Sequence, residues 1–208
     1  MDYLNNTFSP ELTITVPSNG LFISFEDPVI ESIIKTLLGI GSDSGVTVNQ
    51  AANATFTSST FKDNTSITSF PEFGLFTKAN GQNQPQSLFS GCSNLTYIDL
   101  SNVTYLNNSC FNGCSSLSIN NQDIENVIVI GNDCFKGSNV SGDMTFSHLT
   151  SIGSSAFRNT RIQSIDFTGS TFTAVGASTF RGCSHLTKLV LPTTVTTIGN
   201  EWVVDIPR

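Results

Sequence analysis

The sequence has few charged residues and no cluster of basic ones. Lys, Arg, Asp and Glu make up 12% of its 208 residues, about half of the usual share, and the net charge is −7. Nucleic acids and anionic membrane surfaces are bound through a basic footprint, so we expect neither as a partner. No apolar run approaches the roughly 20 residues of a membrane-spanning helix, and we expect no membrane insertion.

The amino terminus lacks the features of a secretory signal. Such a signal has a basic start followed by an apolar stretch, whereas this chain begins Met-Asp-Tyr-Leu-Asn-Asn. If Met1 is the native first residue, we expect a protein that does not leave the cell by this route.

The chain has an odd number of cysteines, five, and this number disfavours a complete disulfide framework. No second Cys or His pair follows at the spacing of a zinc finger, so we expect no metal. The cysteines lie next to a recurring Phe or three residues after it, and this phase predicts buried, reduced thiols. They are Cys92, Cys110, Cys114, Cys134 and Cys183.

Phenylalanine, in contrast, is over-used, with 16 copies against one Trp and three Tyr. Six of these residues recur at regular intervals, first after 28 residues and then every 22 to 24: Phe61, Phe89, Phe111, Phe135, Phe157 and Phe180. A period of about 20 to 29 residues is typical of leucine-rich repeat solenoids. The longer first interval contains a polar insertion at 78–85.

Apolar residues within each repeat follow at spacings of three and two, as in Leu95, Ile98 and Leu100. The last two alternate like one face of a short strand, and a second apolar pair, such as Val103 and Leu106, closes the repeat. One coil cannot bury these residues alone, whereas stacked coils bury them against each other. The sequence therefore predicts a mainly β repeat solenoid of about five to six coils of 22 to 24 residues.

Recurring small residues give each predicted coil its details. A glycine after the second apolar pair is expected to turn the chain back, at Gly131, Gly153, Gly176 and Gly199. Polar residues at 120–123 and 141–143 replace expected apolar ones and predict bulged coils. The predicted structural anchors are Phe89, Phe111, Phe135, Phe157, Phe180, Cys92, Cys114 and Cys183.

The first 55 residues predict a small α/β cap before the solenoid of residues 56–208. Alternating residues at 12–16 and 21–25, joined by a turn, indicate a β-hairpin. Asp27 and Pro28 are typical of a helix start and Gly39 of a helix end. A short helix is expected over 50–54, with Asn49 as its N-cap.

With these residues laid out, the chain resembles the BspA-like leucine-rich repeat family, whose hallmark is Phe-x-Gly-Cys-x-x-Leu-x-x-Ile-x-Leu-Pro followed by Val-Thr-x-Ile-Gly-x-x-Ala-Phe. Residues 182–199 read Gly-Cys-Ser-His-Leu-Thr-Lys-Leu-Val-Leu-Pro-Thr-Thr-Val-Thr-Thr-Ile-Gly, and 149–157 read Leu-Thr-Ser-Ile-Gly-Ser-Ser-Ala-Phe. The resemblance covers about residues 56–200. It implies a protein or cell-surface binding module without catalysis and without a cofactor.

The segment before the repeats resembles an N-terminal segment that is found with these repeats in proteins of gut Bacteroidetes and their phages. In such N-terminal segments an acidic loop of calcium-binding type often follows the helix. Here its ligand positions fall on Gly39, Gly41, Asp43 and Gln50, and only one of them is a carboxylate. Calcium requires several charged oxygen ligands, so we expect this degenerate loop to keep its shape without metal.

The resemblance also frames the expected setting and partners. Known members are largely secreted adhesins, and similar repeats occur in virion proteins of gut phages. With no export signal, we expect a structural or host-attachment component of a phage virion, made in the host cytoplasm. Its partners would be other virion proteins or a host surface receptor. The alternative is a cell-surface or secreted adhesin of a gut bacterium.

Outward-facing strand residues are the predicted binding site: Tyr97, Asp99, Gln163, Asp166 and Lys188. Solenoid strands form extended binding faces, although a plain solvated face is as good an interpretation. Paired aspartates can do acid–base chemistry, but equal spacing in a repeat favours an exposed face. The two histidines, His148 and His185, occupy surface repeat positions. Trp202 either covers the last coil or contacts a partner.

Overall fold

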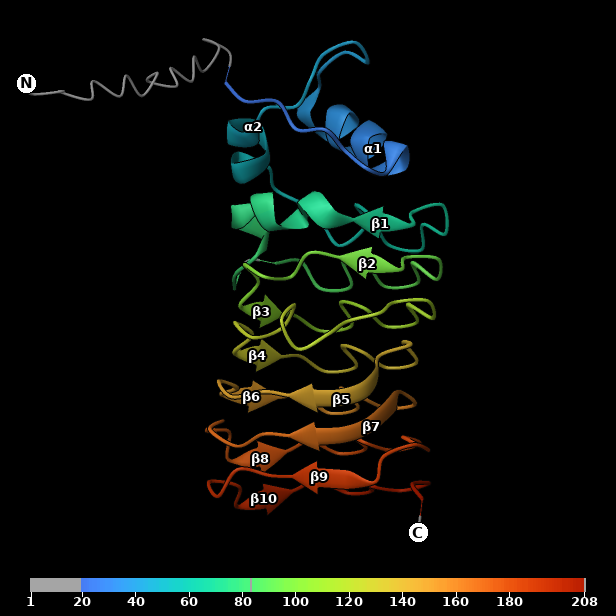
Figure 1. Cartoon of the computed structure of the whole chain (residues 1–208), viewed down its shortest axis with the longest axis vertical. Coiled ribbons are helices and arrows are strands. Elements are labelled where there is room, and N and C mark those ends of the chain that lie inside the picture. The colour runs from blue at the N-terminus through green and yellow to red at the C-terminus, as the bar shows by residue number, and fades with distance from the viewer. Residues whose placement is uncertain (1–19, 83, 208) are drawn as a thin grey trace, which may run out of the picture.

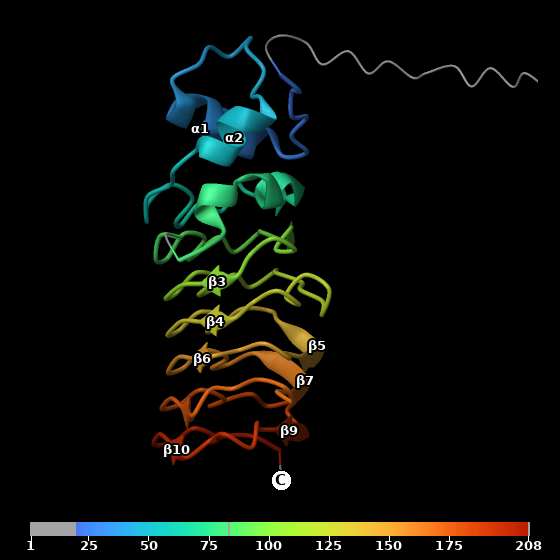
Figure 2. The same ribbon diagram turned by 90° about the vertical axis from the view of Figure 1, so that its left-hand side faces the viewer.

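The computed structural model describes residues 20–82 and 84–207 of the chain. A helical cap stands at one end, and a stack of flattened coils extends from it in a single column (Figure 1, Figure 2). The predicted mainly β solenoid is thereby confirmed. No helix within the two described ranges is long and apolar enough to cross a membrane.

The first helix of the cap, α1 (Pro28–Leu38), begins and ends where the sequence predicts. The Asp27 carboxylate accepts a hydrogen bond of 2.8 Å from the Val29 N–H, which satisfies one of the free amides of the first turn. Gly39 ends the helix in the left-handed conformation, with φ at 64°.

Two other predictions for the cap are wrong. Residues 21–25 form no strand, because Phe22 makes only one antiparallel bridge to Thr47 before the chain turns toward α1; the predicted partner strand at 12–16 lies outside the described residues. The second helix, α2, spans Val48–Asn53 rather than 50–54. Its N-cap is Thr47 rather than Asn49, because Thr47 and Gln50 exchange hydrogen bonds in a capping box.

Two columns of short parallel strands run along the solenoid (Figure 1). The first column contains β1 (Ser69–Phe70), β2 (Tyr97–Ile98), β5 (Ser141–Thr145), β7 (Arg161–Asp166) and β9 (Lys188–Val190). The second contains β3 (Tyr105–Leu106), β4 (Val129–Ile130), β6 (Ser151–Ile152), β8 (Ala174–Val175) and β10 (Thr197–Ile198). In the first coil, the 3-10 helices η1 (Pro71–Leu75) and η2 (Thr77–Ala79) follow β1. Every strand pairs in parallel with a strand of a neighbouring coil.

The recurring phenylalanines form a continuous stack through the core. Successive rings from Phe61 to Phe180 lie 5.0, 5.5, 5.6, 5.5 and 5.8 Å apart and are nearly parallel. Burial of each ring contributes about 1.5–3 kcal/mol, so the predicted anchors are confirmed as the spine of the fold. Trp202 ends the stack, because its ring meets Phe180 edge-on at 6.4 Å.

The cysteines of this spine are buried and reduced, as predicted. Each cysteine at the third position after a Phe forms a hydrogen bond from its sulfur to the Phe carbonyl of the preceding coil. These bonds join Cys92 to Phe61 at 3.0 Å, Cys114 to Phe89 at 3.1 Å and Cys183 to Phe157 at 3.0 Å. At the same repeat position Ser138 and Thr160 bind a Phe carbonyl through a hydroxyl. The cysteines are therefore structural.

The recurring glycines allow neighbouring coils to pack closely. Their position in the sequence predicts instead that they turn the chain back. A Cβ on Gly153 would lie 2.4 Å from the backbone nitrogen of Asn132 in the preceding coil. The same holds for Gly131, Gly176 and Gly199, where the nearest backbone atom would lie 2.5 to 2.6 Å away. Their backbones avoid the left-handed region, so only the contact between coils requires glycine here.

The two coils with polar insertions are irregular, as predicted. Residues 120–123 form turns instead of a strand, and the Asn121 side chain takes the place of a strand beside β5. Its amide donates to the Asp143 carbonyl at 3.3 Å and accepts from the Thr145 N–H at 2.8 Å. Residues 141–143 do form the start of β5, and the irregularity there is a register shift against β7 that leaves Gln163 unpaired.

Candidate functional site

The first strand column displays all five residues of the predicted binding face. Tyr97 on β2 is 40% exposed, and Gln163 on β7 and Lys188 on β9 are also exposed. Asp99 and Asp166 are half-buried at the ends of β2 and β7. The predicted alternation of outward and inward residues therefore places these side chains on the surface.

The structure divides these residues into two groups rather than one surface. Tyr97 and Asp99 lie on the second coil, while the other three lie on the fifth and sixth coils, on β7 and β9. Between them lie β5 and the coil without a first-column strand, whose Ser118 N–H donates to the Thr96 carbonyl at 2.9 Å. A partner would contact one group or would have to span both.

Acidic side chains surround Tyr97. Partial burial, together with the negative charges of Asp123, Asp99 and Glu26, raises the pKa of the Tyr97 hydroxyl above its ordinary value of 10.0. The phenol therefore stays protonated near neutral pH and presents a hydrogen-bond donor beside carboxylates. This combination suits a partner that brings positive charge and an apolar contact.

Two acids near β2 come from the cap and from η1 of the first coil. The Glu26 carboxylate accepts from the Ser69 hydroxyl at 3.1 Å, and the Glu26 N–H donates to the Glu72 carboxylate at 2.8 Å. The second Glu72 oxygen is buried and has no hydrogen-bond partner among the described residues. Tyr97, Asp99, Asp123, Glu26 and Glu72 together are called the Tyr97 surface below.

Sequence reasoning missed three members of the Tyr97 surface. Asp123 lies one repeat length after Asp99, and that phase was a usable signal. Glu26 and Glu72 carried no such signal, because only the packing of the cap on the first coil and of η1 against β2 brings them near β2.

The two repeat-related aspartates have a local structural role. The Asp99 carboxylate accepts from the Ser101 N–H at 2.9 Å, and the Asp166 carboxylate accepts from the Thr168 N–H at 2.8 Å. These are Asx turns, which Asp commonly forms at the end of a strand. The Thr168 hydroxyl and N–H, helped by the charge of Lys188, lower the pKa of Asp166.

The aspartates and histidines form no catalytic arrangement in the described ranges. Asp99 and Asp166 stand on the second and fifth coils. His148 Nδ1 lies 3.3 Å from the Glu125 carbonyl oxygen, and His185 Nδ1 lies 3.2 Å from the hydroxyl of the adjacent Ser184. Both rings are exposed, as expected for surface repeat positions.

The thiols are poor nucleophiles. Burial raises the pKa of Cys92 to about 11, and burial also raises the pKa values of the other four cysteines. Because the thiolate is the reactive form, these residues stay inert at neutral pH. The structure therefore supports their predicted role in the core.

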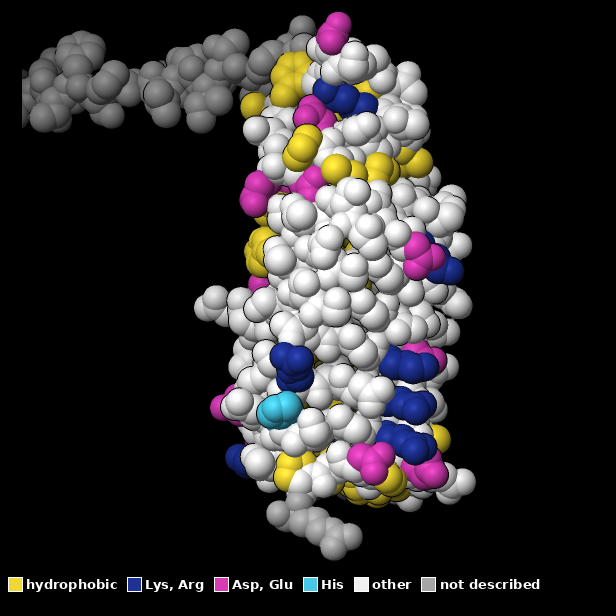
Figure 3. All heavy atoms as spheres, turned by 90° about the vertical axis from the view of Figure 1, so that its right-hand side faces the viewer, with side chains coloured by type: hydrophobic (Ala, Val, Ile, Leu, Met, Phe, Trp, Pro, Cys, Tyr) yellow, Lys and Arg dark blue, Asp and Glu magenta, His cyan; other side chains and the backbone are white. Residues whose placement is uncertain are grey.

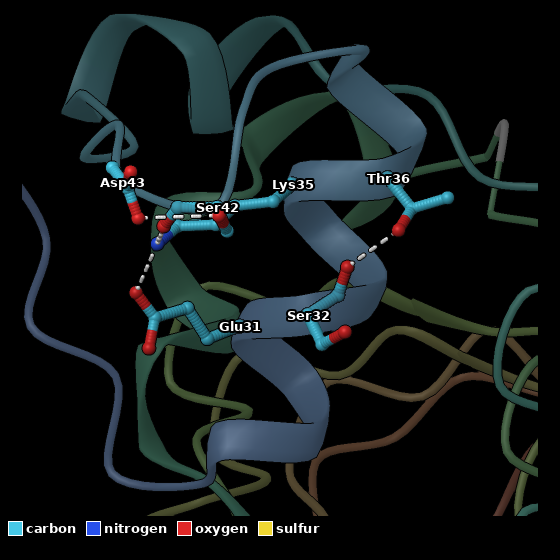
Figure 4. A network of polar contacts seen from close by, with 6 residues as sticks. All are labelled: Glu31, Ser32, Lys35, Thr36, Ser42 and Asp43. Atoms are coloured by element: carbon cyan, nitrogen blue, oxygen red, sulfur yellow. Dashed lines mark hydrogen bonds and ion pairs between the residues drawn. The ribbon is translucent and has the colours of Figure 1, made fainter.

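The loop after α1 uses its expected calcium-ligand positions for other purposes. Gly39 is the C-cap of α1, and the Gln50 side-chain oxygen binds Thr47 in the capping box. The Lys35 ammonium donates to the Ser42 carbonyl at 2.6 Å and pairs with Glu31 at 2.8 Å (Figure 4). A fixed side-chain cation thus ties the loop to the helix, and no cluster of three possible metal ligands occurs within the described part of the chain. That the loop binds no calcium remains a prediction.

Two solved structures have a similar fold. A T. pallidum leucine rich repeat protein superposes with a TM-score of 0.53 at 24% identity, covering 69% of this chain and 65% of that chain. A leucine-rich repeat protein from Bacteroides ovatus ATCC 8483 superposes with a TM-score of 0.50 at 18% identity, covering 71% of this chain and 43% of that chain. This chain therefore spans less than two thirds of the length of either protein. No curated protein matches the sequence.

The sequence also matches the family model of the BspA type leucine rich repeat region. Six copies of the repeat match, over residues 50–140 and 118–204, which is more than half of the chain. The matched residues include every coil of the Phe stack from Phe61 to Phe180, so the repeats of the model are the coils of the structure. The chain therefore belongs to the BspA type leucine rich repeat family, whose repeats form protein-interaction modules.

Proposed function

We propose that the chain is a non-enzymatic attachment module that binds a protein partner through the Tyr97 surface. The observation that carries the proposal is a 40% exposed tyrosine near three carboxylates, one from the cap and two from coils. Tyr is enriched in interfaces because it offers a large apolar area and a hydroxyl at little entropic cost. A rigid coil holds it in place, so little ordering is needed on binding.

The charge of this surface defines the complementary partner. Asp123, Asp99 and Glu26 lie close enough to Tyr97 to raise its pKa. Complementary charge across an interface steers association and selects the partner. The partner proposed here is a protein with basic side chains around an apolar contact, and its association should weaken with salt.

The biological setting proposed is a phage virion, in which the chain is a structural or host-attachment component. The resemblance of the repeats and of the N-terminal segment to proteins of gut phages supports this setting. The second candidate is a surface adhesin of a gut bacterium, which is favoured by the similar fold of a bacterial protein from Bacteroides ovatus. In both settings the chain acts by binding.

Photo-crosslinking tests the site and the setting together. A photoreactive amino acid at position 97 should crosslink to one defined protein in purified virions or on host cells. The same amino acid at position 188, in the other exposed group, should not crosslink to that protein. Equal crosslinking from both positions would overturn the assignment to the Tyr97 surface. If mass spectrometry does not detect this chain in purified virions, the virion proposal is wrong and the adhesin is favoured.

A further inference from the structure

Lys and Arg side chains form a column along one edge of the solenoid, at the turns that contain the anchoring phenylalanines. The residues directly after Phe135, Phe157 and Phe180 are Lys136, Arg158 and Arg181. A backbone ladder sets them in register, because the Gly137 N–H donates to the Arg158 carbonyl and the Asn159 N–H to the Arg181 carbonyl. Figure 3 shows blue side chains in a column at this place. Residues 133–137, 155–159 and 178–182 are called the corner below.

This stack of like charges opposes folding. Adjacent strands lie about 4.8 Å apart, and like charges directly opposite each other are destabilising. Lys62 occupies the same repeat position in the first coil, so four of the nine Lys and Arg residues follow an anchoring Phe. In a chain of net charge −7, such a concentration of cations at one position calls for a compensating anion.

Carboxylates compensate the two ends of the column but not its middle. Asp133 pairs with Lys136 at 3.1 Å, while Glu201 and Asp205 pair with Arg181. Arg158 makes no ion pair within 4.0 Å among the described residues, and its Nε is buried without a hydrogen-bond partner.

The position that supplies acids at the two ends carries serines in the middle. Asp133, Ser155, Ser178 and Glu201 occupy equivalent places two residues before the coil's core residue, all in the left-handed conformation with φ between 52° and 57°. The Asp133 N–H donates to the Ser154 carbonyl and the Ser155 N–H to the Ala177 carbonyl, so this position also stacks. In the two coils between Asp133 and Glu201, Ser155 and Ser178 thus stand where an acid would stand. This gap in the row of carboxylates coincides with Arg158, the cation of the column that has no ion pair among the described residues.

We propose that this gap binds the sulfate esters of a linear polysaccharide. A guanidinium suits a tetrahedral oxyanion such as a sulfate group, because its fixed N–H groups can donate to two oxygens at once. The proposal goes beyond the protein-binding function, because the corner and the Tyr97 surface lie on different sides of the coils.

The spacing of the corner favours a glycan over other polyanions. Equivalent rings of neighbouring coils lie 5.0 to 5.8 Å apart, which is comparable to the length of one sugar ring in an extended glycan. Acidic side chains on one face of an extended peptide recur at about 6.8 Å, which does not match the coil spacing. Net charge −7 disfavours nucleic acid, which needs a broad basic surface.

Binding to heparin, with fully desulfated heparin as the matched probe, tests the proposal. Calorimetry at low salt should detect binding of heparin and not of the desulfated polymer. Arg158→Gln should weaken binding at least fivefold. Ser155→Asp, which places in the gap the acid that Asp133 supplies in the coil before, should abolish it. Arg161→Gln makes the same charge change on β7 and should have little effect.

The outcomes separate this site from the protein-binding site. Tyr97→Ala should leave heparin binding unchanged, so a failure of one proposal does not affect the other. Absence of binding, equal binding of both polymers, or equal losses in Arg158→Gln and Arg161→Gln would each overturn the glycan site. Thermal unfolding of each variant confirms that a lost signal does not reflect a lost fold.

Discussion

The corner and the first strand column belong to the same coils but differ in regularity. At the corner and at the equivalent turns of the earlier coils, the phenylalanines from Phe61 to Phe180 form one ring stack, with spacings of 5.0 to 5.8 Å. In the strand column, one coil has no strand, another has a register shift, and the outward side chains change from coil to coil. The repeated positions hold the fold, and the variable positions around them remain available for binding.

Deleting one ring from the middle of the stack should produce the largest loss of stability. Phe135 is 1% exposed, so Phe135→Ala should lower the free energy of unfolding by about 3–5 kcal/mol, because it leaves a cavity. Urea denaturation followed by circular dichroism measures the loss. Phe22, which is 50% exposed, is the matched control, and Phe22→Ala should cost less than half as much. Equal costs would show that the stack is not the spine of the fold.

Removing the carboxylate that joins the cap to the first coil should have the next largest effect. Asp27 accepts hydrogen bonds from the Val29 N–H, the Thr68 N–H and hydroxyl, and the Ser69 N–H. Asp27→Ala should cost about 1.5–3 kcal/mol, the range for hydrogen bonds to a charged group. Glu31→Ala, which removes an exposed ion pair, should cost about 0.5 kcal/mol or less.

The stability that the Asp27 carboxylate adds to the parent protein, relative to Asp27→Ala, depends on pH with a definite sign. Burial alone would raise the pKa of Asp27, but the hydrogen bonds from Thr68, Val29 and Ser69 outweigh it and lower the pKa below the ordinary value of 3.8. The stabilisation is therefore complete above pH 3.8 and is lost as the pH falls through the lower folded-state pKa. Urea denaturation of the parent and of Asp27→Ala between pH 7 and pH 2 should show that their free energies of unfolding converge only at the acid end.

Gly153→Ala tests whether contact between coils requires the recurring glycines. Its Cβ would lie 2.4 Å from the backbone of Asn132, so the coils must separate, at a cost of about 1–3 kcal/mol. Gly81→Ala is the control, because nothing lies within 4 Å of its Cβ. Thermal unfolding should distinguish the two variants, and equal midpoints would show that these glycines are not packing residues.

Among the substitutions of buried residues, Cys92→Ser should have the smallest effect. The Cys92 sulfur lies 3.0 Å from the carbonyl oxygen of Phe61 in the preceding coil. At the same repeat position in other coils, Ser138 and Thr160 carry a hydroxyl that is buried and bonds the Phe carbonyl of its own coil. The variant should therefore remain within about 1 kcal/mol of the parent in urea denaturation. A larger loss would show that the thiol has a role that the hydroxyl cannot replace.

The regular parts of the molecule were predictable from the sequence. The interval between phenylalanines fixed the coil, the stack and the burial of the cysteines, because each depends on contacts between equivalent positions. Asp27 and Gly39 also predicted the ends of α1 correctly, since helix caps are local.

The parts that depend on contacts without a repeat were not predictable. Residues 21–25 alternate like a strand, yet they meet Thr47 at one bridge only. Glu26 approaches Tyr97 because the cap sits on the first coil, and no pattern in its segment indicates this. The reason for glycine at Gly153 was likewise visible only once the neighbouring coil was in place.

The most direct test compares stability and binding in Tyr97→Ala. Because Tyr97 is exposed and lies outside the Phe stack, the free energy of unfolding should stay within about 0.5 kcal/mol of the parent. Affinity for the protein that crosslinks to position 97, measured by surface plasmon resonance, should fall at least tenfold. Unchanged affinity in a stable variant would contradict the assignment of binding to this variable part of the strand column.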